Sequence, residues 1–463
     1  MGRGFFAGGD SSAVAAKLNG KIDVTQIYSN TQAFAALRAN GSVVTWGTDF
    51  SGGDSSAVAK QLNGKIDVKS IFSTGFAFAA LRADGSVVTW GTDEAGGDSS
   101  AVATALNGSV SKIFSTYSAF AALHDDGSVV TWGNTLAGGD SSSVIAQLVN
   151  VASIYSTAEA FAALRTDGSV ITWGNALAGS DSSAVSTALN GTNEVITIFS
   201  TFDSFAALRA DGSVVTWGFS AGDSSAVADQ LNGSVDVVEI FSTDSAFAAL
   251  RANGSVVTWG DDISVSAFND VAELLNGDID VVNIVSFNRE PTTDQSISFN
   301  GGFAALRADG SVIWWGGGLN STPSGNPILS EKLNGTIDVI ELCATNNGFE
   351  ALRADGSVIS IAAFDNYFAI IEELDGTIDV VKVFSNGSAV AALHADGSVV
   401  TWGDNNYGGD SSSVVDLINS DVVSVVNIAT DDVYHHTTHV GLSLTGDNNA
   451  NKLSGGQNND SIR

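Results

Sequence analysis

Short apolar blocks alternate with polar turns along this chain, and one block of fifteen residues recurs from end to end. Its clearest copy is Ala77-Phe-Ala-Ala-Leu-Arg-Ala-Asp-Gly-Ser-Val-Val-Thr-Trp-Gly91. The spacing between copies is close to 44 residues, a period that is typical of solenoids, propellers and other repeat arrays. The final Trp of each copy is Trp46, Trp90, Trp132, Trp173, Trp217, Trp259, Trp315 or Trp402, and a degraded copy ends at Ile361.

One unit, residues 54–91, predicts a short helix or helical turn followed by three strands. Asp54-Ser-Ser-Ala-Val-Ala-Lys-Gln-Leu-Asn-Gly64 carries an apolar stripe behind a capping Asp. Residues 66–73 are rich in β-branched side chains and predict a strand. Residues 78–81 and 87–90 flank Ala-Asp-Gly, a strong hairpin signal. Both faces of this hairpin are apolar, so we expect neighbouring sheets to cover both, as blades do around a propeller axis.

The same residues resemble a known repeat family. Ile71-Phe-Ser-Thr-Gly-Phe-Ala-Phe-Ala-Ala-Leu81, then Asp84-Gly85 and Val87-Val-Thr-Trp-Gly91, is similar to the repeat of the regulator of chromosome condensation family. The resemblance covers about residues 1–430 and implies a β-propeller, which in that family usually has seven blades. Thr74 and Ala77 stand where the family has Gly and His, and Gly52-Gly-Asp-Ser-Ser56 replaces its Gly-Gln-Leu-Gly loop. Nothing in these residues supports guanine-nucleotide exchange, the activity of the founding member.

The predicted fold is therefore an all-β, propeller-like array of about nine units over residues 1–443, with short helices between units. The alternative is an open superhelical array, although exposed sheet edges favour closure or capping. The seventh unit carries an insertion at residues 287–300, and Ser360-Ile-Ala-Ala-Phe364 replaces Thr-Trp-Gly in the eighth. The chain begins inside a unit, since Gly4-Phe-Phe-Ala-Gly-Gly-Asp10 matches the loop after Trp-Gly, so we expect a fragment of a longer protein.

Composition narrows the possible partners. The chain has 463 residues, 44% of them hydrophobic, and only 3 Pro, which is typical of a folded protein. It has 51 acidic and 19 basic residues, for a formal net charge of -32. Such a charge repels phosphates and attracts cations, so nucleic-acid binding is disfavoured. No apolar stretch of about 20 residues predicts a membrane span, and the N-terminus has no signal-peptide pattern.

The last twenty residues, 444–463, have a different pattern. Gly446-Asp-Asn-Asn-Ala-Asn-Lys-Leu-Ser454 and Gly455-Gly-Gln-Asn-Asn-Asp-Ser-Ile-Arg463 are two nonapeptides in one register. They resemble the opening of an RTX (repeats-in-toxin) β-roll, a family that binds calcium through acidic turns. The resemblance implies a calcium site that these two nonapeptides do not complete. The alternative is that residues 444–463 are simply a polar tail. Its candidate ligands are Asp460, Asn458, Gly456, Asn449 and Asn451.

Several other motifs have simple structural interpretations. Gly218-Phe-Ser-Ala-Gly222 matches the G-x-S-x-G nucleophile elbow but lacks the surrounding strand and helix of a hydrolase. His435, His436 and His439 form the only His cluster, and a polar strand is the favoured interpretation over a metal site. Cys343, the only cysteine, replaces a Phe within a strand and is predicted to be a small core residue.

Two charged positions recur in register. We expect the Arg before each hairpin turn to pair with a nearby carboxylate, the alternative being an anion-binding rim. We expect the Asp at each helix start to cap it, the alternative being cation binding. The Arg positions are Arg38, Arg82, Arg165, Arg209, Arg251, Arg307 and Arg353, with His124 and His394 replacing Arg in two units; the Asp positions are Asp10, Asp54, Asp98, Asp140, Asp181, Asp223 and Asp410.

These observations favour a non-enzymatic, secreted or cell-surface scaffold that binds a protein or glycan on a propeller face or its loops, with calcium in the C-terminal segment. The resemblance to RTX proteins implies bacterial, signal-peptide-independent (type I-like) secretion. The alternative is a cytoplasmic interaction or regulatory propeller without calcium dependence. An enzyme is disfavoured because no unrepeated acid or His cluster stands out from the repeats. Function is expected where the repeat breaks, at the insertion, the eighth unit and the tail.

Overall fold

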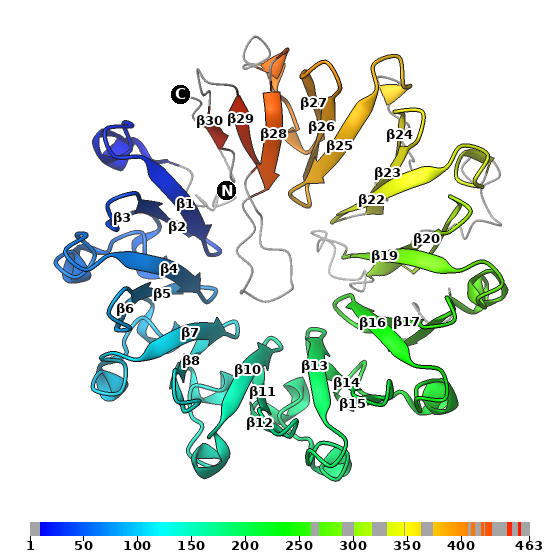
Figure 1. Cartoon of the computed structure of the whole chain (residues 1–463). Coiled ribbons are helices and arrows are strands. Elements are labelled where there is room, and N and C mark those ends of the chain that lie inside the picture. Colours follow the sequence, from blue (N-terminus) through cyan, green and yellow to red (C-terminus); the bar gives the residue numbers. More distant parts are fainter. Residues whose placement is uncertain are drawn as a thin grey trace, which may run out of the picture.

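A computed structural model shows ten three-stranded antiparallel sheets arranged as blades around a central axis (Figure 1). It describes residues 10–260, 268–288, 301–316, 331–346, 348–362, 374–405, 409–412, 418–420, 422–427, 442–446 and 452–454. The prediction of an all-β propeller-like array is confirmed, and the described residues form one blade more than the nine units counted in the sequence.

The strands follow the repeat. Blades 1–5 contain β1 (Val24–Ser29), β2 (Ala33–Arg38), β3 (Val43–Gly47); β4 (Val68–Ser73), β5 (Ala77–Arg82), β6 (Val87–Gly91); β7 (Val110–Ser115), β8 (Ala119–His124), β9 (Val129–Gly133); β10 (Val151–Ser156), β11 (Ala160–Arg165), β12 (Val170–Gly174); and β13 (Val195–Ser200), β14 (Ser204–Arg209), β15 (Val214–Gly218).

Blades 6–10 continue the series. They contain β16 (Val237–Ser242), β17 (Ala246–Arg251), β18 (Val256–Gly260); β19 (Val281–Phe287), β20 (Gly302–Arg307), β21 (Val312–Gly316); β22 (Val339–Thr345), β23 (Gly348–Arg353), β24 (Val358–Ala362); β25 (Val380–Ser385), β26 (Ala389–His394), β27 (Val399–Gly403); and β28 (Val422–Asn427), β29 (Leu442–Gly446), β30 (Lys452–Ser454).

Short 3₁₀ helices connect the blades (Figure 1). They take the place of the predicted helix, which confirms the helical-turn form of that prediction. They are η1 (Ser12–Lys17), η2 (Asp49–Ser51), η3 (Ser56–Val58), η4 (Asp93–Ala95), η5 (Ser100–Val102), η6 (Thr135–Ala137), η7 (Ile145–Gln147), η8 (Ala176–Ala178), η9 (Ser183–Val185), η10 (Ser225–Gln230) and η11 (Ala272–Leu275).

Each hairpin turn also joins its blade to the next. In blade 2 the Asp84 carboxylate accepts the Ser86 N–H at 3.1 Å, and Gly85 adopts a left-handed φ of 75°. The Gly85 carbonyl then accepts the N–H of Val110 as the chain enters blade 3. A Cβ on Gly85 would lie 2.6 Å from the Ser109 backbone nitrogen. Gly is therefore required both by the turn and by the close approach of the neighbouring blade.

The core consists of repeated junctions between blades. At the first junction, Ile71, Phe78 and Trp90 of blade 2 pack against the smaller Ala33 and Ala35 of blade 1. The Phe78 and Trp90 rings stack with centroids 5.3 Å apart. Each blade thus presents an apolar face to both of its neighbours, as the two-sided apolar pattern predicts, and the face toward the next blade combines small Ala side chains with larger ones such as Tyr28 and Leu37.

The indole nitrogen of the repeated Trp also crosses the junction. Trp90 Nε1 donates to the Gly52 carbonyl of blade 1 at 3.0 Å, and Trp132, Trp173 and Trp217 repeat this bond with Gly96, Gly138 and Gly179. Trp259 Nε1 is buried without a hydrogen-bond partner. The expected acceptor would lie in the loop that follows the third strand of blade 5. This loop, residues 218–223, is two residues shorter than the equivalent loop of blade 1, residues 47–54. The shortened loop explains the missing acceptor.

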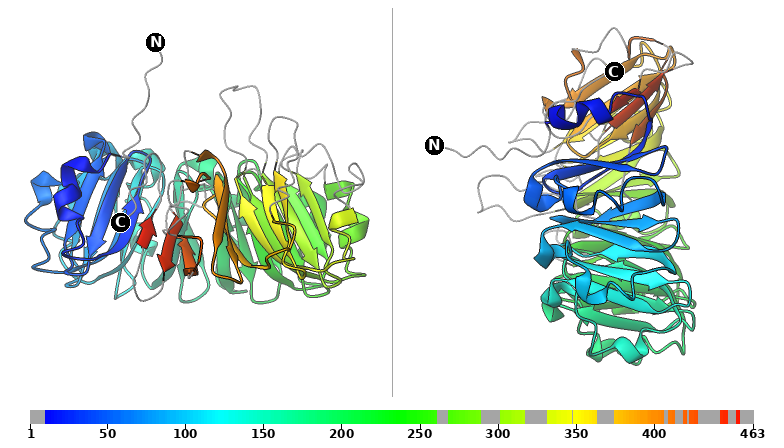
Figure 2. Two further views of the ribbon diagram at one scale, coloured as in Figure 1. Left: turned by 90° about the horizontal axis from the view of Figure 1, so that it is seen from above. Right: turned by 90° about the vertical axis from the view of Figure 1, so that its left-hand side faces the viewer.

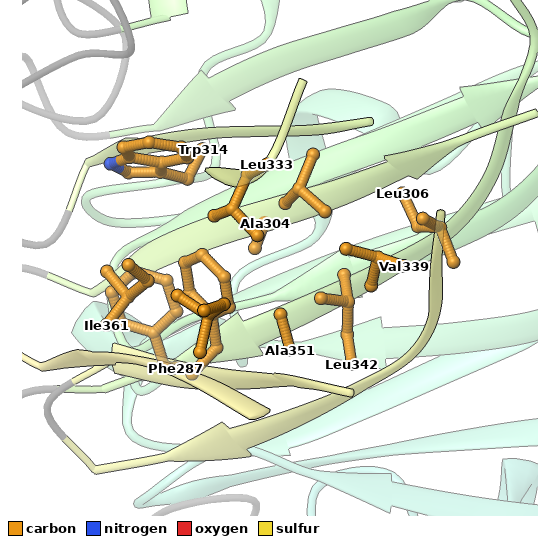
Figure 3. Close-up of a cluster of buried hydrophobic side chains, with 12 residues drawn as sticks. Phe287, Ala304, Leu306, Trp314, Leu333, Val339, Leu342, Ala351 and Ile361 are labelled. Atoms are coloured by element: carbon orange, nitrogen blue, oxygen red, sulfur yellow. The ribbon is translucent and has the colours of Figure 1, made fainter. Parts of the chain in front are cut away.

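The junction between blades 7 and 8 is packed differently (Figure 3). Ile361 occupies the position of the repeated Trp, and Trp314 of blade 7 occupies the position of the repeated Thr. Trp314, Ile361 and Phe349 belong to one buried cluster, in which the Trp314 and Phe349 rings lie 6.1 Å apart. The volume lost at Ile361 is therefore supplied by the neighbouring blade.

Figure 2 shows the strands running across the thickness of the ring, with the first and last sheets at the same level. The sheets are thus arranged in a circle and do not rise along the axis as in an open superhelix. The tenth blade contains β29, which spans the expected domain boundary between residues 443 and 444, and β30, which includes the end of the first nonapeptide. The RTX segment stays a prediction, because residues 447–451 and 455–463 lie outside the described residues.

Candidate interaction face

One face of the ring is built by two sets of loops. Loop 1 joins the first and second strands of a blade, as at residues 74–76, and loop 3 follows the third strand, as at residues 92–99. Because successive strands are antiparallel, both loops lie at the carboxyl ends of the first and third strands. We call this surface the carboxyl-end face.

A chain of backbone hydrogen bonds connects the loops 1 of six consecutive blades. Each loop donates an N–H to a carbonyl of the next, at 2.8–3.3 Å. Such a chain fixes the spacing of the loops around the axis, so the side chains that they carry are held at fixed separations. The donor–acceptor series runs Thr31 to Gly75, Gly75 to Tyr117, Tyr117 to Ala158, Ala158 to Phe202 and Phe202 to Asp244.

A buried threonine ties loop 1 to loop 3 within a blade. Thr116 Oγ1 accepts the Ala119 N–H and donates to the Ala137 carbonyl, each at 3.0 Å. Thr74 and Thr157 make the same pair of bonds. The carboxyl-end face is therefore preorganised by its own backbone.

Large apolar side chains project from these loops. Phe50, Leu136 and Leu177 occupy equivalent places in loop 3 of blades 1, 3 and 4, and Phe219 lies in the shorter loop 3 of blade 5, at the place of Thr48. Their exposed fractions are 58%, 75%, 66% and 66%. We call these four residues the apolar crest. In loop 1, Tyr117 and Phe202 are also exposed, and Phe76 links Phe50 to Tyr117 through ring contacts of 6.5 and 5.6 Å.

The charges on this face are all negative across blades 1–5. Neither loop 1 nor loop 3 of these blades contains a Lys, Arg or His. The recurrent Arg side chains lie at the far end of each second strand, next to the hairpin turns. The carboxylates in the same loops are Asp49, Asp54, Asp93, Glu94, Asp98, Asp140, Glu159, Asp181, Asp203 and Asp223.

A groove of about 410 Å³ lies on this face between blades 2 and 3. Asp93, Glu94 and Asp98 line it from blade 2, and Trp132 lines it from blade 3. The sequence predicted the strands on either side, but the groove depends on the spacing between blades, which no local pattern encodes. A usable signal for the crest was present, namely large apolar residues within otherwise polar loops.

The recurrent Arg residues are largely satisfied within their own turns. Arg82, Arg165, Arg307 and Arg353 form salt bridges of 3.4–3.9 Å with the Asp two residues later. The expectation that these Arg side chains pair with the Asp of the turn is confirmed for these four. Arg38, Arg209 and Arg251 donate to the Ser four residues later, and His394 pairs with Ser398 at the same place.

The recurrent Asp residues lie one residue before the N-cap Ser of η1, η3, η5, η9 and η10, and they accept backbone N–H groups there, which agrees with the predicted capping role. Each carboxylate accepts the N–H of the Ser two residues later at 2.8–3.0 Å, at Ser12, Ser56, Ser100, Ser142, Ser183, Ser225 and Ser412. These bonds lower the pKa of each Asp, for Asp54 chiefly through the Ser56 N–H. The carboxylates remain ionised at neutral pH.

The eighth blade contains a buried carboxylate that the repeat does not. Glu350 replaces the repeated Ala and is only 2% exposed. Its Oε1 accepts Ser360 Oγ at 2.9 Å and Trp402 Nε1 at 3.4 Å, and its Oε2 has no hydrogen-bond partner. Burial raises the pKa of Glu350 to about 8. The carboxyl is therefore largely protonated at neutral pH.

Cys343 lies opposite Glu350 in the same sheet. It is partly buried beside the core between blades 8 and 9, which agrees with the predicted core role. Burial, with the charge of Glu350, raises the pKa of the thiol to about 12. A thiol with that pKa is a poor nucleophile at neutral pH.

The remaining candidate sites can be placed only in part. Within the elbow motif, Ser220 donates to both oxygens of Asp203 at 2.8 and 3.0 Å. The described histidines, His124 and His394, end their second strands at the other face, so no Ser–His relay forms there. His435, His436 and His439 and the calcium candidates Asn449, Asn451, Gly456, Asn458 and Asp460 lie outside the described residues. Within the described part of the chain, no three His, Cys, Asp or Glu side chains are grouped to hold a metal ion.

Comparison with known proteins gives only distant likenesses. No family model and no curated protein matches this chain. The ectodomain of the receptor kinase CR4 from Physcomitrella patens is 15% identical over 64% of this chain and 73% of that one, with a TM-score of 0.32. Yeast RCC1 (Prp20), solved in complex with Kap60, is 16% identical over 51% and 70%, with a TM-score of 0.32. The C-terminal domain of gp131 from bacteriophage phiKZ is 11% identical over 84% and 94%, with a TM-score of 0.27.

Among the described residues no helix is long and apolar enough to cross a membrane. Within the part of the chain that the structure describes, the most distinctive surface is the carboxyl-end face of blades 1–5.

Proposed function

We propose that this protein is a non-enzymatic scaffold that binds a polypeptide partner on the carboxyl-end face of blades 1–5. The apolar crest carries the proposal, because loop 3 of each of four blades exposes one large apolar side chain on the same face. Exposed apolar side chains gathered on one face of a soluble protein mark interaction sites. The aliphatic Leu136 and Leu177 favour a polypeptide over a glycan, since sugars bind chiefly to aromatic faces.

The preorganised loops support the same function. Backbone hydrogen bonds between blades and the buried Thr residues hold the crest before any partner arrives. Binding then orders few groups on this side of the interface, and the entropic cost of association falls.

Selection of short random peptides displayed on phage tests the proposal. The full chain is used as bait beside a variant with Phe50, Leu136, Leu177 and Phe219 changed to Ser. These side chains project into solvent, so the variant should keep its fold, which circular dichroism checks. We expect the wild type to enrich peptides that the variant no longer binds. Equal enrichment on both baits, or none on the wild type, would refute binding through the crest.

Export and calcium binding extend this proposal. Two nonapeptides in one register, a single cysteine and a strongly acidic composition support secretion of the bacterial RTX kind. The alternative, a cytoplasmic regulatory propeller, predicts no calcium response and a cell-associated protein.

Calorimetry of the full chain separates these alternatives. With about 1 mM Ca²⁺, an affinity range typical of extracellular modules, we expect the melting temperature to rise, and Asp460→Ala to lose the response. Mg²⁺ is the control cation. No rise with Ca²⁺, or the same rise with Mg²⁺, would remove the calcium proposal and leave the scaffold proposal standing.

A further inference from the structure

Loop 3 of blade 2, which lines the groove, differs in sequence from loop 3 of blades 1, 3, 4 and 5. At the places of Asp93 and Glu94, the loops of blades 1, 3 and 4 have Asp-Phe, Thr-Leu and Ala-Leu. Glu94 therefore stands where the crest has Phe50, Leu136 and Leu177. With Asp98, it makes blade 2 the one loop 3 in blades 1–5 with three carboxylates in this region.

The fold does not account for these carboxylates. Asp93 and Glu94 are exposed, and within the described residues neither forms a salt bridge. The Leu residues at the place of Glu94 leave most of their surface in solvent, so an apolar residue is compatible with the same loop. The capping bonds from Ser100 lower the pKa of Asp98, which keeps its carboxylate ionised beside the other two.

Apolar side chains also line the groove or lie beside it. Val102 and Trp132 line it beside the carboxylates. On the blade 1 side, the Phe50 carbonyl accepts Thr92 Oγ1 at 2.7 Å, which places Phe50 next to Asp93. On the blade 3 side, Gly133 and Gly139 line the groove and flank the loop that carries Leu136. Negative charge is thus concentrated between two exposed apolar side chains.

We propose that this groove binds a Lys or Arg side chain of a partner polypeptide, with apolar residues on either side of that cation lying on Phe50 and Leu136. The proposal rests on the proposed scaffold function and names the chemistry of the partner. The aliphatic stem of Lys or Arg would cover Val102 and Trp132, while its charged end reaches the carboxylates. Loops 1 and 3 of blades 1–5 carry carboxylates and no basic side chains, so this part of the face is complementary to a cation and not to an anion.

Matched peptides test the groove. We use fluorescent peptides with a central Lys flanked by Leu and Phe, and the same peptides with norleucine in place of Lys. The variant Asp93→Thr with Glu94→Leu gives blade 2 the residues of blade 3. We expect this variant to bind the Lys peptide about fivefold more weakly, the sum of two exposed ion pairs, and the norleucine peptide unchanged. The preference for Lys should disappear in about 0.5 M salt.

Blade 4 provides the matched gain of function. Ala176→Asp with Leu177→Glu places three carboxylates around Asp181, and we expect it to restore the Lys preference in the blade 2 variant. An equal change for the Lys and norleucine peptides, or no change for either, overturns the groove. If the crest variant loses both peptides while the blade 2 variant keeps its Lys preference, the scaffold function stands and the groove assignment fails.

Discussion

Blades 2–5 and blade 8 differ in the side chains and hydrogen bonds that join each blade to its neighbours. In the regular blades, the repeated Trp donates its indole N–H to a Gly carbonyl of the preceding blade, as Trp132 does to Gly96 at 3.0 Å. Blade 8 has Ile361 in place of that Trp and Glu350 in place of an Ala, and Trp402 of blade 9 donates to the Glu350 carboxyl. The substitution of Ile361 for Trp is matched by Trp314 in blade 7, and the substitution of Glu350 for Ala gives the regular Trp402 a carboxyl acceptor. The junction, and not the blade, is the unit that sequence changes must satisfy.

The junction between blades 7 and 8 gives the largest expected effect. Trp314→Thr restores the usual residue of the repeat but removes a large side chain that is 1% exposed. We expect it to cost about 4 kcal/mol in the free energy of unfolding, since it leaves a cavity beside Ile361. Urea denaturation followed by tryptophan fluorescence and circular dichroism measures this value.

The double variant sharpens the comparison. Trp314→Thr with Ile361→Trp rebuilds the regular junction, and we expect it to recover at least half of the lost stability. Additive losses in the double-mutant cycle would show that the two positions do not exchange volume.

The second effect is a dependence of stability on pH. The pKa of Glu350 is about 8 in the folded chain against an ordinary value of 4.5, because the carboxyl is buried. Between these values the folded state holds a proton that the unfolded state has lost. The contribution of Glu350 to stability is therefore highest below about pH 4.5, decreases by about 1.4 kcal/mol per pH unit, and levels off above about pH 8.

Glu350→Ala isolates this contribution from the titration of the other carboxylates. We expect the variant to be more stable than the wild type at pH 7.5 and to lose the difference near pH 4.5, as measured by denaturation at both values. A difference that does not change with pH would contradict a protonated, buried Glu350.

The sequence predicted the regular blades more fully than their junctions. The period and the two-sided apolar hairpin were sufficient for the strands of blades 2–5, and Asp-Gly at residues 84–85 located their turn. The tenth blade was missed because β28–β30 lack the Phe and Trp of the repeated block. The contact of Glu350 with Trp402 joins residues 52 positions apart in two blades, so local periodicity could not reveal it.

A smaller loss of stability is expected in loop 1, where blade 3 uses a Thr and blade 1 an Asn to make the same two hydrogen bonds. Thr116→Val keeps the shape of a side chain that is fully buried but leaves the Ala119 N–H and the Ala137 carbonyl without their partner. We expect a loss of about 1–2 kcal/mol in unfolding free energy.

Blade 1 supplies the control, since Asn30 there accepts the Ala33 N–H and donates to the Ser51 carbonyl. Thr116→Asn should therefore retain more stability than Thr116→Val. If both variants lose the same amount, the hydroxyl acts through packing and not through its hydrogen bonds.

The smallest expected change in unfolding free energy is that of Glu94→Leu. It distinguishes a surface substitution in the repeat from a buried one such as Glu350. Glu94→Leu gives blade 2 the crest residue of blades 3 and 4, and Glu94 is exposed. We expect a change in unfolding free energy within about 0.5 kcal/mol, measured by the same denaturation. Glu350→Ala also restores a repeat residue, yet its effect depends on pH because that carboxyl is buried. A large effect of Glu94→Leu would mean that Glu94 stabilises the loop. The presence of Glu94 in place of Leu would then be explained by loop stability and not by binding of a partner.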